Sequence, residues 1–279
     1  MKERAMSLVA ELLIGYDVEH TGDPEVTRSF LRKAAEVHRD HPCTLFLLGM
    51  TIENNARDLE ELVDNPMFDF QQHTYSHQLL KTVCIEREGQ IEVIRGASLA
   101  QIEDEVCRTS DLLRRYFGKE CIGLTGPWGY YRGLADRPDI LEVLYRLGIR
   151  FTRTYGRDQY DFQPVPFEIQ PFWYEPQGYP DVLELPIHDW QDVYWRGING
   201  WDNMQGYTEH LLECLDYVAA RDLVWSYGTH DWSSVRNDPD MTIIRTLLRE
   251  ADRRGVEVRS YREFYEAAKA EEANLCPKN

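Results

Sequence analysis

The feature of this chain that most constrains its fold is a regular alternation of strand-like and helix-like segments. A short apolar run such as 43–49 (CTLFLLG) is followed by a more polar stretch with helical spacing, such as 52–65. The pattern continues to residue 273, so most predicted strands are followed by a predicted helix. Such an alternation builds parallel βα units, in which the strands form one sheet and the helices cover it.

The predicted elements can be given by residue range. Strands are expected at 8–18, 43–49, 68–74, 121–126, 150–154, 182–190, 223–230 and 256–260. Helices are expected at 23–41, 52–65, 99–118, 138–148, 205–222, 240–255 and 261–273. The third helix has the clearest limits, because Ser98 is a favoured N-cap residue and Gly118 a favoured residue at a helix C-terminus.

This order of elements predicts a single α/β domain over residues 1–279. We expect a distorted (β/α) barrel with about seven or eight strands, similar to a TIM barrel. A doubly wound open sheet is the alternative, because both folds show the same alternation. Residues 155–180 depart from the pattern and are rich in Pro, Gly, Tyr and Phe. A loop of this length in a compact domain is usually functional.

The charge and the cysteines narrow the class of protein. A net charge of −17, from 31 Lys+Arg against 48 Asp+Glu, repels phosphate backbones, so no nucleic-acid partner is expected. The apolar run 7–18 contains Glu11, is too short to span a membrane and lacks a signal-peptide cleavage site. The six cysteines are scattered and form no CxxC pair, which favours free thiols. We expect a cytoplasmic protein that does not bind a membrane.

Chemically reactive polar residues lie at the C-terminal ends of the predicted strands. Asp17 and Glu19 end the first strand, and His73 ends the third. Because the active site of a parallel α/β fold forms at this edge of the sheet, we expect these side chains to converge on one rim. The other members of this set are Pro127, Trp128, His188, Asp189, Trp190, His230 and Asp231.

The two histidines of the segment HTYSH, His73 and His77, stand four positions apart. Taken alone, such a histidine pair is more often incidental than a metal site. In the same way, acidic residues that follow a strand often only cap the next helix. With a carboxylate, two imidazoles form a three-ligand site for a divalent cation and leave positions for water and substrate. A second carboxylate then takes a proton from that water, and a separate histidine protonates the leaving group. Nucleophile-elbow, P-loop, dinucleotide-binding and HExxH motifs are absent from the sequence.

In these residues the sequence resembles the polysaccharide deacetylase family, also known as the NodB-homology domain or carbohydrate esterase family four. HTYSH matches the HxxxH motif of the family, and GYDVEH matches its first motif in an Asp-x-acid form found in intracellular-looking branches. TGPWG partly matches its R-x-P-x-G motif, and PIHDW and YGTH resemble its two later motifs. The resemblance extends over nearly the whole chain.

The resemblance implies a hydrolase of carbon–nitrogen bonds other than peptide bonds, active in carbohydrate metabolism. It implies Zn²⁺ or a similar divalent ion held by His73, His77 and an acid, for which Glu19 is in position. By position, Asp17 matches the general base of the family and His230 its general acid. The resemblance also implies a symmetric homo-oligomer.

The remaining roles follow from the same resemblance. Asp189 matches the group that orients the general acid, with Asp192 as a second candidate. The residues expected to contact substrate are Trp128, Gly129, Tyr130 and Trp190. Two positions depart from the family. Thr125 stands where relatives have the arginine that holds the base, with Arg132 or Arg153 as replacements, and Glu19 is one methylene longer than the usual aspartate.

Three functions are compatible with these residues. The first is metal-dependent N-deacetylation of an N-acetylated sugar or polysaccharide. The second is hydrolysis of a small ureide, cyclic amide or formamide, with or without metal. The third is binding of carbohydrate without catalysis, through stacking on tryptophans. An enclosed pocket under residues 155–180 favours a small amide substrate, whereas an open groove favours a polymer.

Overall fold

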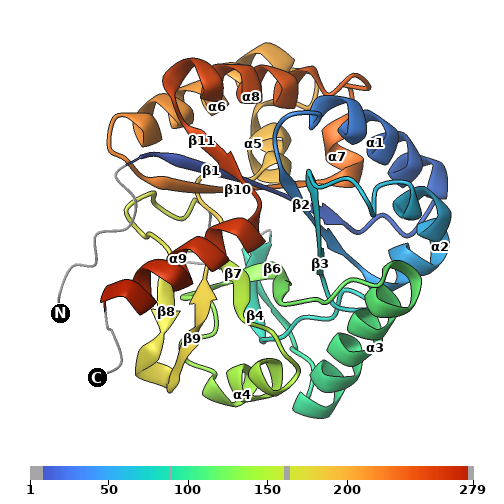
Figure 1. Ribbon diagram of the computed structural model, residues 1–279, viewed down its shortest axis with the longest axis vertical. Coiled ribbons are helices and arrows are strands. Elements are labelled where there is room, and N and C mark those ends of the chain that lie inside the picture. The colour runs from blue at the N-terminus through green and yellow to red at the C-terminus, as the bar shows by residue number, and fades with distance from the viewer. Residues whose placement is uncertain (1–8, 88, 160–163, 276–279) are drawn as a thin grey trace.

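The computed structural model describes residues 9–87, 89–159 and 164–275 and shows a mainly parallel sheet surrounded by helices (Figure 1). The strands of this sheet are β1 (Glu11–Val18), β2 (Cys43–Leu47), β3 (Phe68–Gln72), β6 (Gly123–Tyr131), β7 (Phe151–Arg157), β8 (Phe172–Tyr174), β9 (Tyr179–Glu184), β10 (Val224–His230) and β11 (Glu257–Arg259). A separate hairpin consists of β4 (Val83–Arg87) and β5 (Gln90–Ile94).

The seven predicted helices are present in the predicted order, together with two short ones that were not expected, α5 and α7. They are α1 (Pro24–Val37), α2 (Gly49–Glu60), α3 (Leu99–Phe117), α4 (Pro138–Arg146), α5 (Asp192–Asn199), α6 (Met204–Ala219), α7 (Asp231–Val235), α8 (Thr242–Arg254) and α9 (Tyr261–Leu275), with a short 3₁₀ helix at Glu175–Gln177. The limits of α3 agree with its predicted caps. Ser98 and Gln101 form a capping box, and Gly118 ends the helix in the left-handed conformation at φ 63°.

The strand order is β10-β1-β2-β3-β6-β7-β9-β8, with β11 paired to β1. Every pair along this path is parallel except β8–β9. The predicted α/β fold is therefore confirmed. The sheet is barrel-like, but the strands at its two ends, β8 and β10, do not pair with each other in the described part of the chain, so strand pairing does not close the ring.

The gap between β9 and β10 is bridged by His188, which is buried. Its backbone N–H donates to Ser226 O at 3.0 Å, and its Nδ1 accepts from the Ser226 N–H at 3.0 Å. Its Nε2 donates to Ile169 O at 2.7 Å. Burial lowers the pKa of His188 to about 4, so the ring is neutral. His188 therefore joins the connection after β9 to β10 and does not line the catalytic cavity, near which the sequence pattern had placed it.

Alternation along the strands separates an outer face from an inner face. On β1, Leu12 and Ile14 pack in the core cluster beneath helices such as α1 and α8, whereas Leu13 belongs to a different cluster on the opposite face. Successive side chains of a strand point to opposite faces, so Asp17 shares the inner face with Leu13. Helix α9 packs on this inner cluster through Tyr261 and neighbouring aromatic residues. Apolar side chains therefore fill the inner face beside α9. Asp17 lies on the same face, at the C-terminal end of β1.

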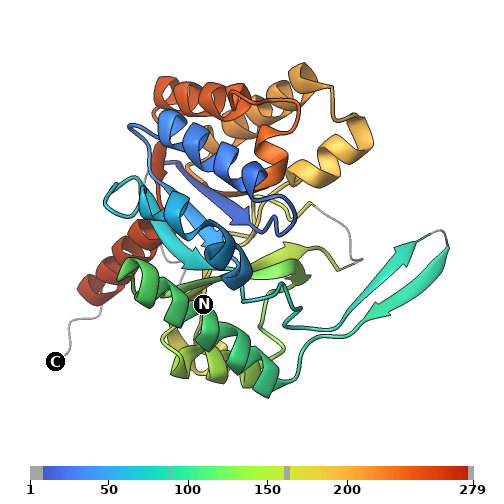
Figure 2. The same ribbon diagram turned by 90° about the vertical axis from the view of Figure 1, so that its right-hand side faces the viewer.

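Several elements differ from the sequence-based expectations. The hairpin β4–β5, which projects from the body of the protein in Figure 2, was not predicted, nor were α5 and α7. The range 155–180 is not one long loop, because it contains the end of β7, all of β8 and the start of β9. Its residues 160–163 lie outside the described part. Among the described residues, no helix has the length and apolar character needed to cross a bilayer.

Candidate active site

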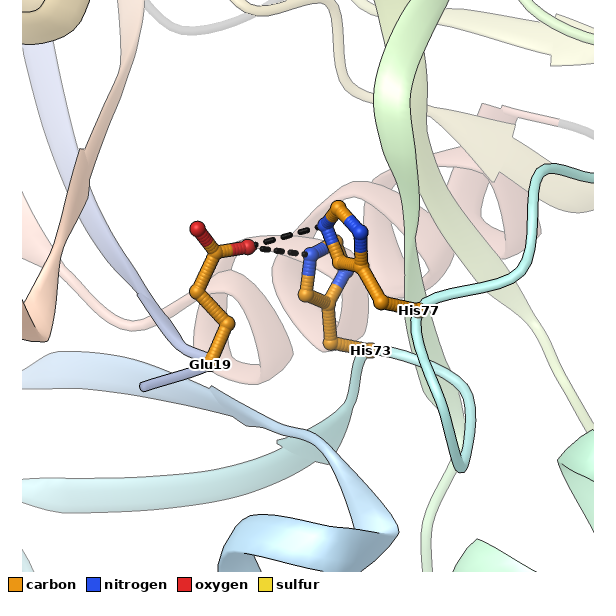
Figure 3. A group of neighbouring side chains, drawn as sticks. All are labelled: Glu19, His73 and His77. Atoms are coloured by element: carbon orange, nitrogen blue, oxygen red, sulfur yellow. Dashed lines mark hydrogen bonds and ion pairs between the residues drawn. The ribbon is translucent and has the colours of Figure 1, made fainter. Parts of the chain in front are cut away.

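Glu19, His73 and His77 come together at the C-terminal ends of β1 and β3, as the sequence predicts (Figure 3). Glu19 Oε2 lies 3.3 Å from His73 Nε2 and 2.9 Å from His77 Nε2. The ligand atoms of the three side chains all lie within 4.8 Å of one another. Two imidazole nitrogens and a carboxylate oxygen at this spacing fit a zinc-type cation that keeps further positions for water or substrate.

The HTYSH segment reaches this geometry through a turn and not through a helix. Thr74 and His77 have φ values of 65° and 64°, in the left-handed region that reverses the chain direction. Glu105 of α3 holds the turn, since its Oε2 accepts the N–H groups of Tyr75 at 3.0 Å and Ser76 at 2.7 Å. Its Oε1 accepts the Ser76 hydroxyl at 2.7 Å. The sequence analysis did not identify Glu105, because one acid on an amphipathic helix gives no sign of its partner.

The orientation of His73 is fixed from behind. Its Nδ1 donates to the backbone oxygen of Thr125 at 3.0 Å, so Nε2 faces Glu19 and is free to bind a cation. Burial is the main cause that lowers the pKa of His73, with a smaller contribution from the charge of His77. A neutral imidazole is the form that coordinates metal ions. The environment of His73 therefore suits a ligand.

Glu19 is held as a carboxylate anion. Burial alone raises its pKa, but the charge of His230 and hydrogen bonds from His73 and His77 outweigh that effect and keep the pKa well below its usual value. The indole N–H of Trp232 donates to Glu19 Oε1 at 3.2 Å. Buried Asp231 accepts the backbone N–H of Glu19 at 3.3 Å, which positions the residue that precedes α1.

Asp17 contacts Arg153, whose side chain is completely buried. Thr125 and Arg153 are partners in the β6–β7 register, and Arg153 Nε donates to Thr125 Oγ1 at 3.0 Å. The guanidinium also lies over the ring of Phe46 at 4.6 Å. Arg153 thus supplies the cation that the sequence lacks at Thr125, one strand further along the sheet. Arg132, the other predicted replacement, is exposed.

His230 is oriented by Asp192 and not by Asp189. Its Nδ1 lies 3.0 Å from Asp192 Oδ1, and the buried Asp192 carboxylate also accepts hydrogen bonds from Thr229 and Ser233. Burial by itself lowers the pKa of His230, but the charges of Asp192 and Glu19 outweigh it and raise the pKa to about 9. The predicted role of Asp189 is wrong, because this side chain turns away and contacts His210. Asp192, the second candidate, orients His230 in the way that was expected of Asp189.

These groups open into one cavity of about 450 Å³. Asp17, Trp128 and Gly129 line it as predicted. Trp190, expected to contact substrate, is not among its lining residues. Tyr130 is buried in the core, where its hydroxyl accepts the Leu80 N–H at 2.7 Å. The register of β6 and β7 shifts before Tyr130, which explains why its side chain does not follow the expected direction.

The remaining wall of the cavity comes from segments that the sequence analysis did not connect with the site. Ile85 and Glu86 extend from β4 of the hairpin, and Tyr194 belongs to α5. Arg157 at the end of β7 also lines the cavity, and its Nε donates to the backbone oxygens of Trp128 and Gly129. Of the described part of 155–180, only this arginine lines the cavity. The described residues of that range therefore do not cover the cavity.

Residues 21–152 match the family model described as polysaccharide deacetylase. The matched segment contains His73 and His77, whereas Asp17, Glu19 and His230 lie outside it. The predicted relationship to this family is confirmed. Polysaccharide deacetylases are hydrolases of amide bonds, so the match agrees with the predicted enzyme class. No curated protein matches the chain.

Solved structures share the polysaccharide deacetylase fold at low sequence identity. A crystal structure described as a polysaccharide deacetylase from Mycobacterium smegmatis is 13% identical, with a TM-score of 0.66 over 96% of this chain and 94% of that one. PuuE allantoinase is 14% identical, with a TM-score of 0.64 over 92% and 88%. A structure of T48 deacetylase with substrate is 17% identical, with a TM-score of 0.53 over 93% and 92%. At these identities the similarity establishes the fold.

Proposed function

We propose that this protein is a metal-dependent N-deacetylase of an N-acetylated sugar or polysaccharide. The observation that carries the proposal is the convergence of Glu19, His73 and His77 beside an acid–arginine pair and a histidine–aspartate pair in one cavity. A silent binding protein has no need of two buried charged pairs beside a ligand triad. The family relationship supports the same chemistry.

In this proposal Zn²⁺ or a similar ion held by Glu19, His73 and His77 supplies Lewis-acid chemistry, which activates water and polarises a carbonyl group. Asp17 accepts a proton from the attacking water, and Arg153 orients its carboxylate and balances its charge. The acetamide carbon gains a bond to the water oxygen, and its bond to nitrogen then breaks.

His230 completes the reaction by giving a proton to the departing amine. Asp192 holds the imidazole through Nδ1, so Nε2 carries the proton that is transferred. The raised pKa of His230, about 9, keeps the ring protonated near neutral pH. Acetate and the free amine are the products. Trp128 and Trp232 on the cavity wall offer flat apolar faces on which a sugar ring can stack.

The proposal is tested by the substitution His77→Ala. We expect the variant to lose zinc at this site and to lose acetate release from an oligomer of N-acetylglucosamine. The matched control is His41→Ala, which removes a histidine that pairs with Asp252 at the surface. If His77→Ala retains both metal at the triad and hydrolysis, the proposed site is wrong.

A second candidate substrate is a small ureide or cyclic amide. Its support is the cavity itself, because Ile85 of the hairpin and Tyr194 of α5 bound a space of about 450 Å³, which suits a compact ligand. The structural similarity to an allantoinase points in the same direction. Product analysis separates the candidates. Acetate release from N-acetylated oligosaccharides supports the first, whereas turnover of cyclic ureides with no acetate release supports the second.

A further inference from the structure

A second cluster of metal-type ligands lies outside the catalytic cavity. It consists of Asp189, in the connection between β9 and α5, and of His210 and Cys214 on α6. Asp189 Oδ2 is 2.5 Å from His210 Nε2 and 3.2 Å from Cys214 Sγ. Cys214 Sγ is 3.7 Å from the same His210 nitrogen. None of the three side chains has a part in the proposed hydrolysis.

The backbone brings these atoms together from two directions. His210 and Cys214 are four residues apart, so they lie one above the other on the same face of α6. Asp189 has a φ of 60°, a left-handed conformation that turns its side chain away from His230 and toward α6. Its backbone N–H donates to Val165 O at 2.9 Å, which anchors the turn.

The arrangement is not that of a nucleophilic cysteine. A Cys–His–Asp relay uses the two different ring nitrogens of histidine, one for the thiol and one for the carboxylate. Here Nε2 of His210 faces both Asp189 and Cys214. Three different donor atoms that converge on one point are what a coordinated cation requires. Without an ion, His210 Nε2–H and the Cys214 thiol both donate to Asp189 Oδ2, and a cation at this point would replace these two protons.

We propose that Asp189, His210 and Cys214 form a second metal site, which binds Zn²⁺ or a zinc-like transition-metal ion with water as the fourth ligand. The thiolate and imidazole ligands select this class of ion over Ca²⁺ and Mg²⁺, which prefer oxygen. Ligands of a tetrahedral zinc ion lie roughly 3.3 Å apart, given Zn–N and Zn–O bonds of about 2.0 Å. Asp189 and His210 therefore move slightly apart when the ion replaces the proton that they share.

An ion at this site has to displace the proton of the buried Cys214 thiol. Burial and the neighbouring Asp189 carboxylate raise the pKa of the Cys214 thiol, so it is protonated when no ion is bound. Binding of a cation releases that proton and converts the thiol into a thiolate. His210 keeps its ring plane during the exchange because it stacks on Trp195 of α5, with centroids 5.6 Å apart.

The position of the site gives it a structural role. Asp189 precedes Asp192 by three residues, and Asp192 is the group that orients His230. An ion bound to Asp189 and α6 fixes the connection that presents Asp192. The proposed metal site does not depend on the identity of the substrate, because its evidence lies in the cluster alone.

Cobalt binding distinguishes this site from the catalytic triad, which contains no sulfur. We expect metal-free protein titrated with Co²⁺ to develop a near-ultraviolet absorption from thiolate-to-cobalt charge transfer. The absorption should persist in His77→Ala and in Cys84→Ser, which removes an exposed cysteine, and should disappear in Cys214→Ser. Zinc analysis should give two ions per chain for the unmodified protein and one for either His77→Ala or Cys214→Ser.

The variant Asp189→Asn provides a second test that leaves the buried cysteine in place. It should weaken zinc binding at this site at least tenfold while the charge-transfer band remains attainable at high Co²⁺. Circular dichroism of each variant serves as the control for folding. Absence of a thiolate–cobalt band in the folded, unmodified protein would overturn the proposal. A band of equal strength in Cys214→Ser would overturn it too.

Discussion

At the scale of single residues, the chemistry of the site depends on two charged pairs, Asp17–Arg153 and Asp192–His230, each with at least one fully buried member. Arg153 has no solvent exposure and contacts Asp17, and Asp192 is buried against His230. Removing one member of such a pair leaves the other as an uncompensated charge in a poorly solvated place. The two pairs therefore contribute to stability as well as to proton transfer, and substitutions should separate these effects.

Arg153→Met leaves the Asp17 carboxylate without its partner. We expect the free energy of unfolding to fall by about 3 kcal/mol, because breaking a buried ion pair typically costs about 3–5 kcal/mol. The double variant Asp17→Asn/Arg153→Met should recover much of that loss while remaining inactive. Urea unfolding measures both values. Equal stability of the unmodified protein and Arg153→Met would contradict the role given to this pair.

The pH dependence of hydrolysis should reveal the pair His230–Asp192. A general acid works in its protonated form, so activity is present below the pKa of His230 and is lost as the pH rises through it. The charge of Asp192 contributes to raising this pKa to about 9. Asp192→Asn removes that charge, so the basic limb of the kcat/KM profile should move to lower pH by about one unit or more. A cation bound beside Glu19 lowers the pKa of His230 in both the unmodified protein and the variant. The basic limb of the variant should still lie at the lower pH. An unshifted limb would exclude His230 as the acid.

At the scale of elements, the HTYSH turn shows how a helix positions metal ligands that it does not carry. Glu105 of α3 accepts three hydrogen bonds from Tyr75 and Ser76, the residues between His73 and His77. The left-handed φ of His77 has a conformational cost, which these bonds offset. The geometry of the triad therefore depends on α3 as well as on β3.

Glu105→Ala should weaken zinc binding at the triad by about 10- to 100-fold, the range typical when a residue supporting metal ligands is lost. Competition with a chelator of known affinity gives the value. Glu103→Ala is a matched control on the same helix, since Glu103 pairs with Arg146 at the surface. If the two variants bind zinc equally well, Glu105 does not position the triad.

Periodic elements could be predicted from the sequence, and short or polar ones could not. Helix α3 has its N-cap, its C-cap glycine and its apolar spacing in the expected places. Helix α5 has only eight residues, and its buried side chains are Asp192 and Arg196, so it carries no apolar period. The hairpin residues Ile91 and Val93 are exposed, so no buried face marks β5.

The same limit applies to the site. Asp17, Glu19, His73, His77 and His230 could be located because strand ends of a parallel sheet meet at one edge. The HDWQD segment lies beyond the end of the strand, where side chains no longer alternate between two faces. The sequence pattern therefore does not indicate which aspartate faces His230. The left-handed Asp189 turned one acid toward α6, and the helix start at Asp192 brought the other inward. Only the three-dimensional path of the chain distinguishes them.

At the scale of the whole molecule, the connection after β9 is held to β10 by the backbone and side chain of one residue, His188. His188 joins the connection after β9 to β10 through Ser226 and reaches Ile169 on a third segment. β10 carries His230 at its end, and the connection after β9 leads to Asp192. His188 therefore joins the two segments that carry the proposed acid, His230, and its partner, Asp192.

His188→Leu should reduce the free energy of unfolding by about 2–3 kcal/mol, because it leaves the Ser226 N–H and the Ile169 carbonyl without partners in a buried place. Zinc binding at the triad, which lies on β1 and β3, should be unchanged. Chemical denaturation and zinc titration of the same preparation test both statements. A stable variant that had lost zinc would contradict the structural role and would place His188 in the active site.

The central claim is that hydrolysis requires a cation at Glu19, His73 and His77. The most direct measurement is acetate release from an N-acetylglucosamine oligomer by metal-free protein, before and after addition of one to two equivalents of Zn²⁺. We predict no release without metal, recovery on zinc addition, and no recovery in His77→Ala. Equal acetate release by the metal-free and zinc-loaded proteins would contradict the claim.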